Sequence, residues 1–516
     1  MNPLRSPKWL RAAVLITALL CVPAPQARAQ QTAIEKLAEV LGDALKAATG
    51  REVKQKDAVA RQVLAQPAMP AVLTPEAELK ARKVRLDAFR DVSIAWLDGT
   101  VSLADNQQLL LEKTLDQAIA SSQVAAKKPQ ANNQRMNPGF NDHFAITFTD
   151  TDGAARKVDL LHFEKLLAET DLTPEQAVRL AAAAKERREF HQSATLGHIL
   201  NILDAELYFT AGQRTAIGDA AREKIQLNSA CYALRPMNYY FQQTPITPLL
   251  KRGNHLNVLS EAQKRRATDL SATNTDNAEQ YVSFQSNEGV DLWQDTLRNA
   301  IKAQRERLTR AVAVRVDFHQ ALNEMSDSDA RHLQVAGKGA TDAAIARWKT
   351  TSRQQLKTFE QHAMGAIGNF SFSLQVPNVD QIDADGIWKH SMEQLVPKST
   401  DQLNLRDSVR LEATAKFVVA MLDKELWLTK AQREILIDAV RKELPSPDTK
   451  IQNANYFLEV TLLTIPMFKL SKRELSVLTD TQKAAFEAMK KPFQKQNSYI
   501  LVQMQNGGQM HLQIPK

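Results

Sequence analysis

The sequence predicts a mainly α-helical protein built from two tandem helical units, with small β-hairpins and a β-hairpin at the C-terminus. Two observations carry this prediction. Residues 194–225 match residues 413–444 without a gap, and a Leu-Thr-x-x-Gln element typical of helix starts recurs in both halves. Apolar residues at helical spacing dominate the remaining chain, and only short runs alternate in the way that strands do.

The N-terminal segment has the three parts of a secretory signal peptide. Cations precede the apolar run 12–22, and the small-residue site Ala27-Arg28-Ala29 follows it. This order predicts cleavage after Ala29 and export to the periplasm or the extracellular space. The alternative, a buried N-terminal helix, would have to accommodate Pro23 and Pro25 beside the small-residue site.

Charge and hydropathy narrow the classes of partner. The net charge of +8 falls to +4 once the signal peptide leaves with Arg5, Lys8, Arg11 and Arg28. Basic runs such as 185–189 are interleaved with acids, which is typical of a solvated helix face rather than of a nucleic-acid interface. After the signal peptide, no segment approaches the roughly twenty apolar residues that a membrane span requires. We therefore expect a possible protein partner, no nucleic acid and no membrane span.

The internal similarity keeps one register over a long distance. Leu203–Arg214 aligns with Leu422–Arg433, which places Asp204 and Asp423 219 positions apart. The same offset relates further pairs on both sides of this stretch: Ala194-Thr195 with Ala413-Thr414, Arg222 with Arg441, and Gln263 with Gln482. Two unrelated amphipathic helices would not keep one register across a turn and a loop, so the match predicts a duplication.

Boundaries follow from changes in composition. Residues 33–48 have a helical apolar face and precede a proline-containing stretch, whereas residues 271–290 are rich in Asn, Ser, Thr and Gln. The predicted order is a signal peptide (1–29), an amphipathic helix and linker (30–75), helical unit 1 (76–270), a linker (271–299), helical unit 2 (300–490) and a C-terminal β-hairpin (491–516). If the two units are separate domains, each should fold alone.

Four short alternating runs predict strands. Apolar residues alternate over 144–148 before a turn at Asp150-Thr151-Asp152-Gly153, and again over 370–376 before Pro377. Near the C-terminus, alternating runs flank Asn506-Gly507, whose residues tolerate positive φ angles. This last pattern is a specific signal for a β-hairpin.

The Leu-Thr-x-x-Gln element has a physical explanation as a capping box. The Thr hydroxyl accepts a bond from the amide three residues on, and the Gln side chain reaches back to the amide of the cap. The element occurs at 172–176, 428–432 and 478–482, with variants at 209–210, 259–260 and 103–104. The boxes that begin at Thr210 and Thr429 each follow a Leu-Asp-x-Glu-Leu helix end, which predicts two helical hairpins.

The apolar side of each hairpin should form its core. On the first helix of each hairpin the expected core positions are Ile199, Ile202, Leu203 and Leu207, matched by Val418, Met421, Leu422 and Leu426. Asp204 and Asp423 are candidate functional carboxylates. Each lies beside a basic Gln-Arg helix start, so we expect pairs that hold the fold instead.

Two resemblances support this architecture. The Leu-Thr-x-x-Gln boxes resemble those of the small periplasmic Spy-like chaperones, which are helical proteins that bind unfolded clients. The longer pattern, a capped helix at 326–339 followed by the box at 428–433, resembles exported planctomycete proteins of unassigned function with tandem helical units. The second resemblance spans most of unit 2 and implies an architecture without an activity.

The sequence assigns no catalytic, cofactor-binding or metal-ligating residue. Gly337-Lys338-Gly339 lacks the strand and the ending of a phosphate loop and is interpreted as a helix interruption. Asp383-Ala384-Asp385-Gly386 lacks two ligands of a calcium loop. His191 and His198 are too far apart in sequence to share one zinc ion, so we expect surface or partly buried histidines, and Cys231 is expected to be a buried small hydrophobe.

These observations favour an exported, non-catalytic helical protein that binds or scaffolds another macromolecule and needs no cofactor. The alternative is an extracytoplasmic hydrolase with its site between the two units, because spacing motifs miss many hydrolases.

Overall fold

The computed structural model describes most of the chain after residue 74. The described residues are 75–125, 147–149, 155–157, 172–224, 249–250, 253–272, 281–285, 290–323, 325–363, 371–396, 401–447, 454–490, 493–496, 499–503 and 509–513. The predicted signal peptide, the helix and linker of 30–74, the turn at 150–153 and Cys231 lie outside these residues.

The protein is mainly helical, which confirms the predicted class. The helices in chain order are α4 (Pro75–Val101), α5 (Asp105–Ala125), α8 (Pro174–Leu207), α9 (Ala211–Lys224), η2 (Asn254–Val258), α12 (Glu261–Ala272), α13 (Val290–Asn323), α14 (Asp327–Ala363), α15 (Asp380–Asp383), α16 (Gly386–Leu395), α17 (Asp401–Leu426), α18 (Lys430–Glu443), α19 (Ala454–Lys469), η3 (Glu474–Val477) and α20 (Asp480–Lys490). None of these helices is long and apolar enough to cross a membrane.

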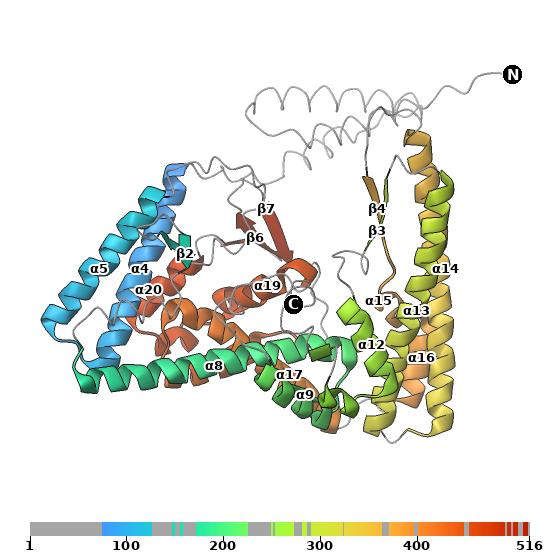
Figure 1. The fold of residues 1–516 in the computed structure, drawn as a ribbon, viewed down its shortest axis with the longest axis horizontal. Coiled ribbons are helices and arrows are strands. Elements are labelled where there is room, and N and C mark those ends of the chain that lie inside the picture. The colour runs from blue at the N-terminus through green and yellow to red at the C-terminus, as the bar shows by residue number, and fades with distance from the viewer. Residues whose placement is uncertain are drawn as a thin grey trace, which may run out of the picture. The chain divides into compact units, whose positions relative to one another are not determined.

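The long helices α8 and α17 lie side by side (Figure 1). α8 begins after the cap Thr173 with Pro174 in its first turn, where the missing N–H of proline costs no hydrogen bond. All eight positions that were predicted to face the core are buried: Ile199, Ile202, Leu203, Leu207, Val418, Met421, Leu422 and Leu426. α9 folds back on α8, and α18 folds back on α17, as expected for two helical hairpins.

Three apolar clusters form the core of the described residues. The first joins α4 and α5 to α17, α18, α19 and α20, and includes Phe89, Leu97, Leu426 and Phe486. The second lies among α13, α14, α16 and the strands β3 (Tyr281–Gln285) and β4 (Ser371–Gln375). The third fills the space between the C-terminal half of α8, α9 and α12.

The strands form three small antiparallel sheets among the described residues. β1 (Thr147–Thr149) pairs with β2 (Ala155–Lys157) on the two sides of the predicted turn. β3 pairs with β4, with Phe284 opposite Phe372. At the C-terminal end, β5 (Phe493–Gln496), β6 (Tyr499–Gln503) and β7 (Gln509–Gln513) lie in that order.

The segment predicted as a linker, 271–299, contains regular structure. β3 and the first turns of α13 lie inside it. The polar composition concealed an alternation in which Val282 and Phe284 face the core while Ser283 is exposed. This run pairs with β4, where Phe372 and Leu374 face the same way, so a strand forms because its partner provides the other half of the apolar face.

The predicted helix interruption at 337–339 is wrong, because α14 continues through it. Gly337 allows a close approach between helices. A Cβ atom placed on Gly337 would lie 2.3 Å from Cγ1 of Val312 on α13 and 2.9 Å from Cζ3 of Trp388 on α16. Gly339 has nothing within 4 Å of the equivalent point. Gly337 therefore allows α13 and α16 to pack closely against α14, and this packing explains a glycine in the middle of a helix.

Candidate functional site

The glutamines of the capping boxes join pairs of helix starts. Thr429 and Gln432 form a complete capping box at the start of α18. The side-chain amide of Gln432 then donates to Oε1 of Gln482 at 2.8 Å and to the Val477 carbonyl at 3.0 Å. Gln482, in the box that starts α20, donates in turn to the Leu426 carbonyl at 3.0 Å. We call this arrangement a glutamine clamp: it ties two helix starts to the end of a third helix.

The same clamp is present 219 positions earlier. Gln213 donates to Gln263 at 2.9 Å and to the Val258 carbonyl at 2.9 Å, and Gln263 donates to the Leu207 carbonyl at 2.7 Å. In both clamps the second glutamine also bonds the carbonyl of an aromatic residue with positive φ, Tyr208 here. A left-handed aromatic residue is strained, and the clamp supplies the bonds that keep it there.

A third clamp joins two of the predicted elements, the variant at 103–104 and the box at 172–176, although their pairing was not predicted from the sequence. Gln107 and Gln176 bond each other through their side chains at 3.1 Å, and Gln176 donates to the carbonyl of Ser102 at 2.9 Å. Ser102 has a φ of 57°, the same left-handed conformation. Asp98 accepts a hydrogen bond from the amide of Leu103, five residues on. Asp204 and Asp423 each accept the same bond from the amide five residues on. The shared signal is an Asp nine residues before the Gln.

Asp423 is fully buried and lies among groups from three helices. Its Oδ1 accepts from the Leu428 amide at 2.5 Å, and its Oδ2 accepts from Nε of Arg187 at 2.8 Å. Nε2 of His191 lies 2.6 Å from the same Oδ2, and Arg433 approaches it at 3.7 Å. Burial alone would raise the pKa of Asp423, but the charges of Arg187 and Arg433 and the His191 bond outweigh it and hold this pKa below its ordinary value.

Aromatic rings close the site around Asp423. The guanidinium of Arg187 lies 3.8 Å from the ring centroid of Trp427, whose ring is 4.9 Å from that of Trp96. Burial lowers the pKa of His191 below 6.5, although the hydrogen bond to Asp423 acts in the opposite direction. The imidazole is therefore neutral at pH 7 and serves as a hydrogen-bonding partner of the carboxylate.

Asp204 has a matching but more basic environment. Its Oδ1 accepts from the Phe209 amide at 2.7 Å, and its carboxylate pairs with Arg214 and Arg406 at 3.3 Å and with Arg410 at 3.7 Å. Asp204 is fully buried, and the three arginine side chains are at most 13% exposed. Three guanidinium groups therefore share one buried carboxylate.

Two further arginine contacts extend this basic region. Arg406 and Arg315 lie 5.2 and 5.3 Å from the ring centroid of Tyr208, and Arg315 pairs with Asp383. Burial and the positive charges of Arg315 and Arg406 lower the pKa of His319 to about 4. A protonated His319 would add a third positive charge beside Arg315 and Arg406 at a position that is largely buried from water, so the neutral form is favoured.

The lowered pKa of His319 predicts a loss of stability in acid. The unfolded chain binds a proton at this residue near pH 6.5, whereas the folded protein stays neutral down to about pH 4. The stability that neutral His319 contributes is therefore fully present above pH 6.5 and is lost as the pH falls from there toward about 4. We expect the free energy of unfolding, from urea titrations, to drop by about 2–3 kcal/mol between pH 7.5 and 4.5 through this residue.

The variant His319→Gln should lose less stability than the wild type over the same pH interval. His390, an exposed histidine on α16, provides the matched control His390→Gln. Equal pH dependence in His319→Gln and in the wild type would show that His319 does not contribute.

Both aspartates form the ion pairs that the sequence led us to expect, Asp204 with Arg214 and Asp423 with Arg433. The sequence did not reveal the other partners, which come from the opposite half of the chain. His198 corrects the expectation of a surface or partly buried histidine, because it is only 2% exposed and stacks on Phe417. The bond between His191 and Asp423 has the geometry of a catalytic base and its orienting acid, but arginines and tryptophans enclose it.

The segment 383–386, which the sequence analysis compared with a calcium loop, has a structural role. Asp385 caps α16 and accepts from the amides of Ile387 and Trp388, while Asp383 pairs with Arg315. Within the described ranges, no group of three or more His, Cys, Asp or Glu side chains could hold a metal ion.

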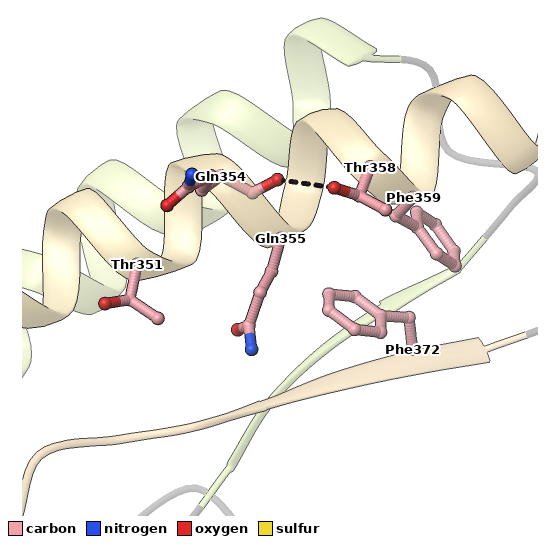
Figure 2. Close-up of a pocket in the computed structure, with 6 residues that line it drawn as sticks. All are labelled: Thr351, Gln354, Gln355, Thr358, Phe359 and Phe372. Carbon is pink, nitrogen blue, oxygen red and sulfur yellow. Dashed lines mark hydrogen bonds between the residues drawn. The ribbon is translucent and has the colours of Figure 1, made fainter. Parts of the chain in front are cut away.

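An open groove lies between α14 and β4 (Figure 2). Phe359 and Phe372 stack at its end, with ring centroids 4.7 Å apart and planes inclined by 24°. The other lining residues are uncharged and form a stripe on α14: Thr351, Gln354, Gln355 and Thr358. Gln355 points toward the strand, and the Thr358 hydroxyl donates to the Gln354 carbonyl at 3.0 Å. The groove thus offers an aromatic surface and amide and hydroxyl groups, without an acid or a base.

Sequence reasoning missed this groove. Its only signal is the spacing of Thr351, Gln355 and Thr358 on one face of a helix, which equally suits a solvated surface. No protein-family model, no curated protein and no solved structure matches the chain.

Proposed function

We propose that the chain is an exported, non-catalytic binding protein with a duplicated helical unit and a C-terminal β-hairpin, and that the groove between α14 and β4 holds an extended, uncharged polypeptide segment. The lining of the groove carries this proposal. Two stacked aromatic rings bury an apolar side chain of the partner, and the uncharged stripe on α14 provides donors and acceptors for its backbone.

The strand beside the groove supports a polypeptide partner. In the part of the chain that the structure describes, β4 pairs with β3 alone. A strand edge without a neighbour offers backbone N–H and C=O groups that an extended peptide can bond. Trp348 on α14 donates to the Gln375 carbonyl at 2.7 Å, so α14 lies beside β4 and already occupies this one carbonyl. We expect the groove and the remaining backbone groups of this edge to act together on one bound segment.

The chemistry of the groove supports binding over hydrolysis. Its lining residues have no titratable side chain, and Thr358 is committed to a bond with its own helix. A hydrolase needs a nucleophile or an activated water with a base near pH 7. The signal-like N-terminus supports export, which places the partner outside the cytoplasm.

The variant Gln355→Trp should block the groove and weaken binding at least tenfold, because the indole fills the space beside Phe359 and Phe372. The probe is fluorescein-labelled, reduced and carboxamidomethylated α-lactalbumin, a permanently unfolded chain whose capped cysteines are uncharged, and the measurement is fluorescence anisotropy with the mature protein from Gln30.

Gln334→Trp is the matched control. Gln334 is also an exposed glutamine on α14, six turns away, and it does not line the groove. The control should bind the probe as the wild type does. Equal binding by wild type and Gln355→Trp would refute the groove, and the absence of binding by the wild type would refute the proposed function.

A further inference from the structure

The two buried aspartates are held across the chain by corresponding positions. Asp204 on α8 pairs with Arg406 on α17, and Asp423 on α17 pairs with Arg187 on α8. Arg187 and Arg406 are 219 positions apart, which is also the separation of the two aspartates. When residue i meets residue j and the counterpart of j meets the counterpart of i, a two-fold axis relates the two elements.

Residues on such an axis must touch their own counterparts, and one pair does. His198 and Phe417 are also 219 positions apart, and their rings stack with centroids 3.9 Å apart and planes inclined by 6°. The helices come close here, because a Cβ atom on Gly197 would lie 3.2 Å from the Cβ of Ala413. The second pair of partners repeats the exchange, since His191 bonds one aspartate and its counterpart Arg410 pairs with the other.

We propose that the two halves are copies of one unit related by this internal two-fold axis, and that each unit packs its N-terminal pair of helices on the C-terminal helices of the other. The N-terminal pairs are α4–α5 and α13–α14, and the helices on which they pack are α17–α20 and α12. Each unit thus completes the packing of the other, as the two copies do in a domain-swapped dimer, but here both copies belong to one polypeptide. The surface that joins the halves fits a second copy of the same unit, and here that copy is supplied by the chain itself. This inference is independent of what the groove binds.

The N-terminal pair of helices of the first unit completes the core of the second. α4 packs on α20 and on α17, and its side chains belong to the same apolar cluster as those of α18 and α19. Phe89 lies 6.1 Å from Trp427 between ring centroids, and Leu97 is fully buried in this cluster. α4 thus stabilises a bundle that begins more than three hundred residues later in the chain.

The N-terminal pair of helices of the second unit makes the reciprocal contact. α13, the counterpart of α4 at the same offset, packs on α12, which is the counterpart of α20. The Ser260 hydroxyl of α12's capping box donates to Asp317 of α13 at 2.6 Å, and Arg310 pairs with Asp269 at 2.6 Å. Pro75–Lys516 accordingly forms one compact unit instead of two.

Cutting the folded chain between the halves tests whether they hold together. A specific protease site is inserted into 273–280 of the full mature chain, and the protein is cleaved after folding. We expect the two fragments to elute as one particle with the size of the uncut protein and to part only in denaturant. Elution of two separate folded fragments in buffer would overturn the proposal that each unit packs on the other.

Hydrogen exchange tests which N-terminal pair supports which C-terminal helices. Phe89→Ala in the full chain should accelerate amide exchange in α18 and α20 at least tenfold, while α9 and α12 keep their protection. Acceleration confined to α9 and α12 would mean that α4 supports its own unit and would overturn the proposal. If Phe89→Ala does not fold, Trp96→Ala removes a partly buried ring beside Trp427 and reports on the same helices.

Discussion

Replacing Asp423 with asparagine should lower the free energy of unfolding by about 3–5 kcal/mol, because the change leaves buried arginines without their counter-charge. The carboxylate is fully buried, and Arg187 is only 5% exposed. Asparagine keeps the size and one acceptor for the Leu428 amide, so the loss reports the charge rather than a cavity. Urea unfolding followed by circular dichroism at pH 7.5 measures the change.

Asp438→Asn is the control for this experiment. Asp438 is exposed and pairs with Arg441 on the same helix, so its replacement should change stability by less than about 0.5 kcal/mol. A loss below about 1 kcal/mol in Asp423→Asn would mean that solvent reaches the site or that Glu186, which also pairs with Arg433, neutralises the arginines.

The comparison between Asp423 and Asp204 explains how far the sequence could lead. Both aspartates, their following boxes and the buried faces of α8 and α17 were predicted, because capping and helical periodicity are local properties. Their partners Arg187 and Arg406 were not, because contacts between distant helices leave no mark in local spacing. One signal was available: both arginines obey the 219-residue offset, seven positions outside the aligned stretch.

The groove could not have been predicted in the same way. Phe359 and Phe372 meet through the packing of a helix on a strand, and the sequence between them gives no geometry. Polar stripes such as Thr351 and Gln355 also occur on every solvated helix face. Only the position of β4 beside α14 distinguishes this stripe from the others, and that position depends on the pairing with β3, in a segment whose composition suggested a linker.

Gly337 and Gly339 should respond in opposite directions to the same substitution. Both lie inside α14, where alanine is intrinsically better than glycine by roughly 0.8–1.0 kcal/mol. Gly339→Ala meets no atom within 4 Å and should gain up to about that amount. Gly337→Ala places its methyl against Val312 and Trp388, both nearly fully buried, and overpacking of this kind costs about 1–3 kcal/mol.

A double-mutant cycle identifies the cause of the loss at Gly337. Val312→Ala removes Cγ1, the atom that would lie nearest to the new methyl group, so Gly337→Ala should cost less in that background than in the wild type. Thermal or urea unfolding of the four proteins gives the coupling. If both glycine substitutions stabilise α14 equally, then α13 and α16 do not approach Gly337 closely, and the interpretation of this glycine as a packing residue fails.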